Sequence, residues 1–345
     1  MNQVKRVLVI DDSAYVRKVV TQILSRSPFL EVVGTARDGL DALEKVEALN
    51  PDVVTCDLIM PEMDGVEFVR EQMRRRHLPI IIMSIASETA EMTLTALELG
   101  AVDFVQKPTA LATDKILDIS DELIAKVKAA ADIPTSRLPV IEAVPPKLKL
   151  ATAHKGAVDM VVIGISTGGP QALRYVIPQL PANFSVPIAI VMHMPVGYTE
   201  MYAQKLNELT NLDFHEAKEG EVVHPGAVLL APAGRHLTFR RSKNESVVAH
   251  LNARPFETLH RPSVDVLFRS AAEIYDSRVL GVVMTGMGAD GKEGASWIKA
   301  RGGLIYTESE ETCVVYGMPR ATVEAGLSDR SVPLDQMAQA IWEVI

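Results

Sequence analysis

The sequence predicts an α/β protein with two domains, each built on a parallel or mostly parallel sheet. Its length of 345 residues exceeds what one hydrophobic core usually fills. Short apolar runs alternate with amphipathic stretches in both halves of the chain, a pattern typical of βα units. A proline-containing stretch without a sustained period separates the two series. We therefore expect domains at residues 1–130 and 158–345, joined by a linker at 131–157.

The first series predicts a five-stranded parallel sheet. Its apolar runs, the expected strands, are Arg6–Ile10, Glu31–Thr35, Asp52–Cys56, Pro79–Met83 and Val102–Val105. The intervening amphipathic stretches, the expected helices, include Ser13–Arg26, Gly39–Leu49 and Glu88–Leu99. A last helix is expected over about Leu111–Ala130.

The second series predicts a doubly wound, mostly parallel sheet. Its apolar runs are Met160–Ile165, Pro187–Met192, Ala227–Ala231, Val279–Met284 and Gly303–Tyr306. The run Val228–Leu230, followed by Gly234 and Leu237–Phe239, predicts a hairpin or a short antiparallel excursion.

Composition excludes several classes of protein. Apolar residues make up 48% and charged residues 23%, as in soluble globular proteins. The net charge of −9 argues against nucleic acid or an anionic membrane surface as a partner. No stretch is apolar enough to span a membrane, and the N-terminus lacks a signal peptide pattern. Cys56 and Cys313 are the only cysteines, which fits a reducing cytoplasm.

Polar side chains gather where the strands of the first domain are expected to end. Asp11 and Asp12 follow the first strand, Asp57 the third, Ser84 the fourth and Lys107 the fifth. The carboxyl ends of parallel strands share one edge, where ligands bind. Three carboxylates there favour a divalent cation such as Mg²⁺, while Lys107 and Ser84 could hold a phosphoryl group. Taken alone, Asp11-Asp12 could equally be a helix N-cap.

These residues resemble a response-regulator receiver domain. The matching motifs are IDDS at Ile10–Ser13, DLIMPEMDG at Asp57–Gly65, Ser84, and KP at Lys107-Pro108. The resemblance implies a flavodoxin-like sheet and phosphorylation of Asp57 by a histidine kinase. It also implies Mg²⁺ bound by Asp11, Asp12, Asp57 and the Ile59 carbonyl, and a switch that uses Ser84 and Phe104.

A serine stands at the start of the second domain, on a predicted strand-to-helix turn. Gly164-Ile165-Ser166-Thr167-Gly168 is a G-x-S-x-G pattern, which can present a nucleophilic hydroxyl. Such a serine needs a base and a group that orients the base. His193 and Asp290 follow two other expected strands and could fill these roles. The order Ser, His, Asp differs from that of α/β-hydrolases.

Each of these residues also has a simpler interpretation. The glycine-rich turn could bind a phosphate or nucleotide, although the spacing fits neither G-x-G-x-x-G nor a P-loop. His193 could be a hydrogen-bonded core histidine, and Asp290 a turn or N-cap residue.

The second domain resembles the catalytic domain of the chemotaxis methylesterase (CheB) family. The matching runs are GISTGGP at Gly164–Pro170, MHMP at Met192–Pro195, APAG at Ala231–Gly234, HRPSVDVLF at His260–Phe268 and TGMGADG at Thr285–Gly291. The resemblance implies a nucleophile, a base and an orienter at Ser166, His193 and Asp290. It further implies an oxyanion donor at the Met287 N–H, with Thr167 at the edge of the site.

The implied activity is hydrolysis of glutamate 5-methyl esters on methylated chemoreceptors, and deamidation of certain receptor glutamines, without a cofactor for the esterase reaction. Phosphorylation of the receiver is expected to free the catalytic cleft. Two other classes compete with this hypothesis. One is a non-catalytic signalling adaptor with an α/β binding domain. The other is a DNA-binding regulator, against which the long, non-basic second domain argues.

Overall fold

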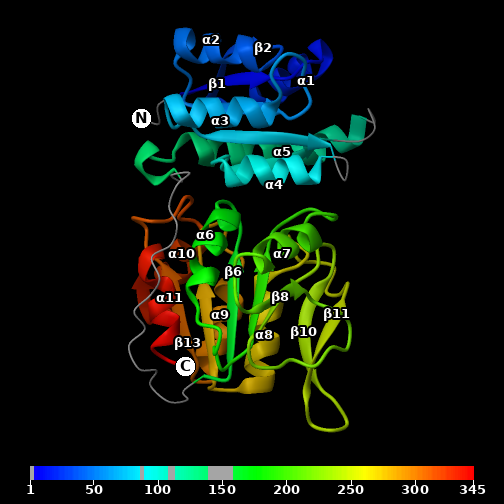
Figure 1. The fold of residues 1–345 in the computed structure, drawn as a ribbon, viewed down its shortest axis with the longest axis vertical. Coiled ribbons are helices and arrows are strands. Elements are labelled where there is room, and N and C mark those ends of the chain that lie inside the picture. The colour runs from blue at the N-terminus through cyan, green and yellow to red at the C-terminus, as the bar shows by residue number, and fades with distance from the viewer. Residues whose placement is uncertain (1–3, 86–88, 108–112, 139–157) are drawn as a thin grey trace. The chain divides into compact units, whose positions relative to one another are not determined.

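The computed structural model describes residues 4–85, 89–107, 113–138 and 158–345. By contacts within the chain, residues 1–143 and 144–345 form two compact units (Figure 1). No helix among the described residues is long and apolar enough to cross a membrane.

The first unit is built on a five-stranded parallel sheet in the order β2-β1-β3-β4-β5. Its strands are β1 (Lys5–Ile10), β2 (Leu30–Ala36), β3 (Val53–Asp57), β4 (Ile80–Ile85) and β5 (Asp103–Lys107). Its helices are α1 (Ala14–Leu24), α2 (Gly39–Leu49), α3 (Gly65–Arg75), α4 (Ala90–Glu98) and α5 (Thr113–Ala131). All five predicted strands are confirmed, with ends that differ by one or two residues.

Side-chain N-caps mark the beginnings of α1, α2 and α3. Ser13, Asp38 and Asp64 each accept a hydrogen bond from a main-chain N–H three residues later. Gly65, which follows one of these caps, lies so close to β3 that a Cβ there would stand 2.1 Å from the Asp57 carbonyl oxygen. Only glycine therefore lets the loop after β3 return to the base of α3.

The second unit is built on a seven-stranded sheet in the order β14-β13-β12-β6-β7-β9-β8, and all of its neighbouring pairs are parallel. Its strands are β6 (Met160–Ile165), β7 (Ile188–Met192), β8 (Asp213–Glu216), β9 (Ala227–Leu230), β12 (Val279–Val283), β13 (Leu304–Glu308) and β14 (Arg330–Val332). Its helices are α6 (Gly169–Val176), α7 (Thr199–Asn207), α8 (Val264–Tyr275), α9 (Lys292–Ala300), α10 (Met318–Glu324) and α11 (Leu334–Trp342).

The strand order changes direction at β6. The chain passes from β6 toward β8 on one side and later returns to β12 on the other. Right-handed crossovers then place the helices of the two directions on opposite faces, with α8 and α9 against β6, β12 and β13. The carboxyl end of β6 is thus the topological switch point, the place where ligands bind in open α/β sheets.

The predicted hairpin has a different partner in the structure. Val228–Leu230 belongs to β9, a buried strand inside the parallel sheet. Leu237–Phe239 lies in β10 (His236–Arg241), which pairs antiparallel with β11 (Val247–Asn252) in a separate two-stranded ribbon. The hairpin alternative was wrong because it joined a fully buried run to one with an exposed end, and these patterns belong to different kinds of sheet. The other alternative, a short antiparallel excursion, is confirmed by the pairing of β10 with β11.

Candidate functional site

Three aspartates and a lysine meet at the carboxyl edge of the first sheet. Carboxylate oxygens of Asp11, Asp12 and Asp57 lie within 4.8 Å of one another. The Lys107 ammonium, on the last residue of β5, lies 2.5 Å from Asp11 Oδ2 and 2.8 Å from Asp57 Oδ2. The structure therefore brings together the residues that strand-end reasoning placed at this edge.

The electrostatics of this edge follow from burial of like and unlike charges. Burial raises the pKa of the Asp57 carboxyl, helped by the charge of Asp11 and opposed by Lys107. Burial alone would lower the pKa of Lys107, but Asp57 and Asp11 bring it above its ordinary value. The three carboxylates offer the oxygen ligands that a hard divalent cation prefers, so the residues present fit such an ion.

The predicted switch residues lie on the neighbouring strands. The Ser84 hydroxyl is buried and hydrogen-bonds to the hydroxyls of Thr89 and Thr93. Phe104 is buried in β5. Ile59 lies in the loop after β3, and because its side chain is a hydrocarbon, only its main-chain carbonyl could bind an ion.

Ser166 is the first residue beyond β6, at the switch point of the second sheet. Its N–H donates to the Thr285 carbonyl at 3.0 Å, and its carbonyl accepts from the Gly169 N–H at 2.6 Å. Gly168 takes a φ of +80°, which glycine tolerates, so that α6 can begin at the next residue. The half-buried serine thus stands on the predicted strand-to-helix turn.

His193 follows the adjacent strand at the same level as Ser166. Ile165 and Met192 pair in register, and the His193 N–H donates to the Ile165 carbonyl at 3.2 Å. Neighbouring strands lie about 4.8 Å apart, so the two residues leave the sheet side by side. His193 Nε2 lies 2.8 Å from Asp290 Oδ2, with both side chains about nine-tenths buried.

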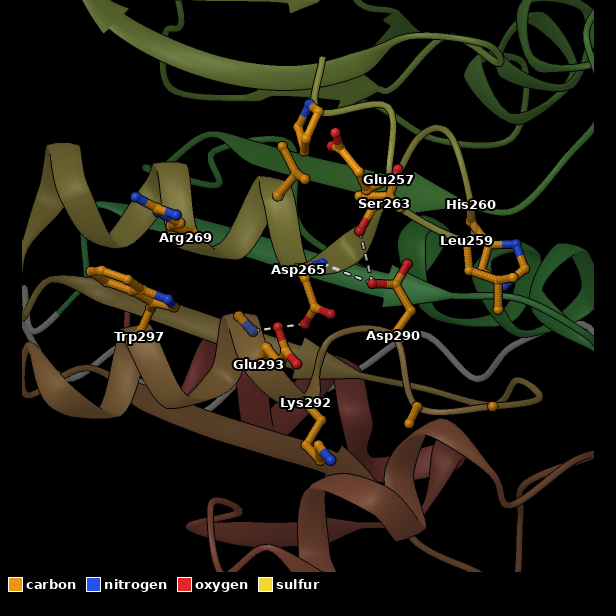
Figure 2. Close-up of a pocket in the computed structure, with 16 residues that line it drawn as sticks. Glu257, Leu259, His260, Ser263, Asp265, Arg269, Asp290, Lys292, Glu293 and Trp297 are labelled. Carbon is orange, nitrogen blue, oxygen red and sulfur yellow. Dashed lines mark hydrogen bonds between the residues drawn. The ribbon is translucent and has the colours of Figure 1, made fainter. Parts of the chain in front are cut away.

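Asp290 is bound at the N-terminus of α8. Its carboxylate accepts hydrogen bonds from the Ser263 hydroxyl at 2.9 Å and the Asp265 N–H at 3.0 Å (Figure 2). It also accepts from the Val264 N–H at 2.8 Å. Burial would raise the pKa of Asp290, but the bonds from His193 and from these N–H groups bring it well below its usual range. Asp290 is therefore a fixed anion, suited to orient the histidine and to stabilise its protonated form.

Asp265 makes the reciprocal contact at the next helix. Its carboxylate accepts from the N–H groups of Gly291 and Gly294 at the start of α9. Burial and the nearby charge of Asp290 raise its pKa to about 6, against the bonds from the two glycines. The two aspartates thus connect the loop after β12 to the N-termini of α8 and α9.

The second ring nitrogen of His193, Nδ1, is the atom that could accept a proton from Ser166. Nδ1 is buried without a hydrogen-bond partner, and no hydrogen bond joins Ser166 to His193 in the described part of the chain. Because Nε2 is occupied by Asp290, Nδ1 is the atom available to a serine proton. The ring stacks on His260, with 4.0 Å between centroids and 24° between planes. Catalytic hydrogen bonds are often long until substrate binds.

The loop after β12 lies against the serine. A Cβ on Gly286 would stand 2.8 Å from Ser166 Cβ, so glycine is required for this approach. The Thr285 hydroxyl donates to the carbonyl of buried Thr167 at 2.9 Å. Met287 follows directly and is half-buried. The loop is therefore bonded to the turn that carries the nucleophile, and the main chain of Met287 follows the residue that approaches Ser166 most closely.

A pocket of about 540 Å³ borders this site (Figure 2). Asp290 and His260 line it, together with Leu259, Arg269 and Trp297, but Ser166 and His193 do not. The Arg269 guanidinium lies 4.5 Å from the centre of the Trp297 ring. The pocket is thus a space that shares Asp290 with the histidine–aspartate pair and is not lined by the nucleophile.

Three contributors to the site were not assigned a role from the sequence. Ser263, Asp265 and His260 all belong to one segment, HRPSVDVLF, whose residues match a family motif without indicating their contacts. Ser263 and Asp265 lie at the start of α8, but the carboxylate to which they donate, that of Asp290, is 25 to 27 residues away. A contact between residues so far apart in the sequence cannot be predicted from a local pattern.

Comparisons with known proteins show the family of each unit. A family model described as CheB methylesterase matches residues 161–341, and one described as response regulator receiver domain matches residues 7–118. A Myxococcus xanthus protein named protein-glutamate methylesterase/protein-glutamine glutaminase 5 is 48% identical over 333 residues, 96% of this chain and 95% of that protein. A Halalkalibacterium halodurans protein named protein-glutamate methylesterase/protein-glutamine glutaminase is 44% identical, covering 97% of each.

A solved structure matches the second unit. The crystal structure of the Thermotoga maritima CheB methylesterase catalytic domain has a TM-score of 0.53 and 41% sequence identity. The match covers 55% of this chain and 99% of that domain. The seven-stranded sheet with its switch point is therefore similar to a catalytic domain that was crystallised as a separate chain.

Proposed function

The chain belongs to the CheB methylesterase family and carries a receiver domain, and on this premise we propose that Ser166, His193 and Asp290 hydrolyse glutamate 5-methyl esters of chemoreceptors. The observation that carries the proposal is the buried His193–Asp290 pair at the strand end beside Ser166. The direct test is methanol release from methylated receptor, measured with and without a phosphodonor. A serine-reactive probe should label Ser166, whereas an adaptor without catalysis would not react.

The first half of the reaction is acyl transfer to the serine. Ser166 Oγ attacks the ester carbonyl as His193 Nδ1 takes its proton, and the carbonyl oxygen becomes an oxyanion. The Met287 N–H, with Thr167 at the edge of the site, is the proposed donor to that oxygen. Collapse of the intermediate breaks the bond to the methoxy group, which leaves as methanol with the proton from His193.

The second half releases glutamate. Water attacks the acyl-serine while His193 accepts its proton, and Ser166 leaves with that proton as glutamate forms. The same steps on a glutamine side chain would release ammonia. Asp290 stays ionised throughout, since its hydrogen bonds hold its pKa well below its usual range. It keeps the ring in place and stabilises the imidazolium.

The receiver domain is proposed to control this reaction through Asp57. Asp11, Asp12, Asp57 and the Ile59 carbonyl would hold Mg²⁺, which would neutralise charge during phosphoryl transfer from a histidine kinase. Lys107 and Ser84 would then bind the phosphoryl oxygens, with Phe104 responding to the change. A cytoplasmic location fits these partners and the two buried cysteines, Cys56 and Cys313.

Asp57→Asn should abolish activation by a phosphodonor, because the amide cannot accept the phosphoryl group. Esterase rates with and without a small-molecule phosphodonor measure this. Glu44→Gln, an exposed change on α2, is the matched control and should retain activation. Activation of the Asp57 variant equal to that of the parent would exclude Asp57 as the phosphoacceptor.

Deleting residues 1–150 should raise the basal esterase rate if the unphosphorylated receiver limits access to Ser166. The homologous Thermotoga maritima domain was crystallised alone, which supports folding of the fragment. The rates of fragment and full chain are compared without phosphodonor. A folded but inactive fragment would mean that the receiver supplies part of the site.

A further inference from the structure

Glu308 is a fully buried carboxyl that the proposed mechanism does not use. It is the last residue of β13 and has no exposed surface. Among the described residues, no lysine, arginine or histidine forms an ion pair with it. A buried carboxylate without a cation is costly unless its oxygens are hydrogen-bonded, so its contacts indicate what it is there to hold.

Both carboxyl oxygens accept hydrogen bonds from segments that flank the serine site. The Thr285 N–H donates to Oε2 at 2.9 Å, and the Thr312 hydroxyl donates to Oε1 at 3.1 Å. Thr285 is the second residue beyond β12, where the chain leaves the sheet. The Glu308 side chain therefore supplies the acceptor for a main-chain N–H at the point where the loop toward Met287 begins.

Thr285 is in turn hydrogen-bonded to the turn that carries the nucleophile. Its carbonyl accepts from the Ser166 N–H at 3.0 Å, and its hydroxyl donates to the Thr167 carbonyl at 2.9 Å. The same hydroxyl accepts from the Val315 N–H at 3.0 Å. The N–H, the carbonyl and the hydroxyl of Thr285 thus all form hydrogen bonds, and the carbonyl and the hydroxyl bind the turn that carries Ser166. A shift of the Thr285 main chain would move that turn.

We propose that Glu308 is a positioning residue for the nucleophile, which it holds through the Thr285 main chain. It touches neither substrate nor reacting atoms. Its carboxyl fixes Thr285, and Thr285 fixes the Ser166-Thr167 turn and the start of the Met287 loop. The inference rests on the proposed function, because it concerns the geometry in which Ser166 attacks.

The test compares Glu308→Met with Glu308→Gln in the full chain, in the presence of phosphodonor. Met has a similar length but replaces the carboxyl oxygens with a thioether sulfur, which is only a weak acceptor for the Thr285 N–H. Gln keeps a carbonyl oxygen for the Thr285 N–H and an amide that can donate to Thr312. Methionine should lower kcat by roughly 10²-fold with KM little changed, since small misplacement of reacting groups has such effects. Glutamine should restore most of kcat.

Thr307→Val is the matched control for loss of a buried hydrogen bond. Thr307 precedes Glu308 on the same strand, is equally buried, and bonds to the Ser328 hydroxyl rather than toward the serine site. Its loss should lower stability without changing kcat. The labelling rate of Ser166 by a serine-reactive probe should fall in Glu308→Met and stay unchanged in Thr307→Val.

Thr312 provides an independent variant pair if Glu308→Met does not fold. Thr312→Val removes the hydroxyl that holds Oε1, and Thr312→Ser keeps it. We expect a lower kcat in the valine variant than in the serine variant, with the same KM. Equal kcat in these two proteins, or equal kcat in folded Glu308→Met and Thr307→Val, would overturn the proposal.

These outcomes are separate from a failure of the proposed function. If Ser166→Ala retains activity, the serine mechanism fails and Glu308 has no nucleophile to position. If Ser166→Ala is inactive while Glu308→Met has normal kcat, only the positioning role is excluded.

Discussion

Ser166→Ala is expected to lower kcat/KM on methylated receptor by about 10⁴-fold, or roughly 5 kcal/mol of transition-state stabilisation. The alanine removes the atom that attacks the ester and leaves the rest of the turn intact. The turn is held by main-chain bonds of Ser166 to Thr285 and Gly169, which the substitution retains. The melting temperature should therefore change little while the reaction is lost.

The double variant with His193→Ala should lose little more than either single variant. Removal of either the serine or its base already abolishes the step that the two carry out together. The rate losses of the two single variants are therefore far from additive in the double variant. Asp290→Asn should be milder than either, since it leaves nucleophile and base in place. Rates of methanol release from each single and double variant give these ratios.

Ser296→Ala is the control for a serine hydroxyl on the same unit. This exposed hydroxyl donates to the Glu293 carbonyl within α9, away from Ser166, and its loss should not change the rate. Near-normal activity of Ser166→Ala would refute the serine mechanism. A further full 10⁴-fold loss in the double variant would show that Ser166 and His193 do not act as a pair.

The sequence was sufficient to place the main site residues because strand ends are encoded locally. A buried apolar run followed by Asp57, Ser166 or His193 predicts both the strand and the edge at which the side chain emerges. The structure places each of these residues at such an edge. The pairing of β10 with β11 was not predicted, because an apolar run in the sequence does not indicate the strand with which it pairs.

The side-chain contacts of the site could not be predicted in the same way. Asp290 is bound by Ser263 and the start of α8, and Thr285 by Glu308, across 23 to 27 residues. These contacts depend on how α8 and β13 pack on the sheet, which no local pattern specifies. A glutamate at the end of an apolar run looks like an exposed residue until its burial is known.

Burial of Glu308 should also make the stability of the second unit depend on pH. Burial raises the pKa of this carboxyl to about 7, against the bonds from Thr285, Thr312 and Cys313, from an ordinary value of 4.5. Between these two values the folded protein binds a proton that the unfolded chain releases. The free energy of unfolding therefore falls as pH rises from about 4.5 to 7, by roughly 3 kcal/mol from this group.

The charged groups on the elements that pack against β13 or follow it in the sheet are too exposed to neutralise this carboxyl. They are half-buried or exposed side chains on α9, α10 and β14: Lys292, Glu293, Lys299, Arg320, Glu324 and Arg330. Lys299 and Arg330 are in addition paired with Asp329 and Glu343. The desolvation of Glu308 is consequently not offset by a nearby cation.

Glu308→Gln should remove this dependence, because glutamine fills the same space and does not ionise. Relative to the parent, the variant should gain roughly 3 kcal/mol of unfolding free energy between pH 4.5 and pH 8. Urea unfolding at a series of pH values, followed by tryptophan fluorescence, measures it, since Trp297 and Trp342 both lie in the second unit. Asp265, whose pKa of about 6 acts in the same direction, is present in both proteins and cancels in the difference.

Glu293→Gln, on the exposed side of α9, is the control and should parallel the parent at every pH. A stability difference between Glu308→Gln and the parent that does not change with pH would mean that the Glu308 carboxyl is not buried in the folded protein.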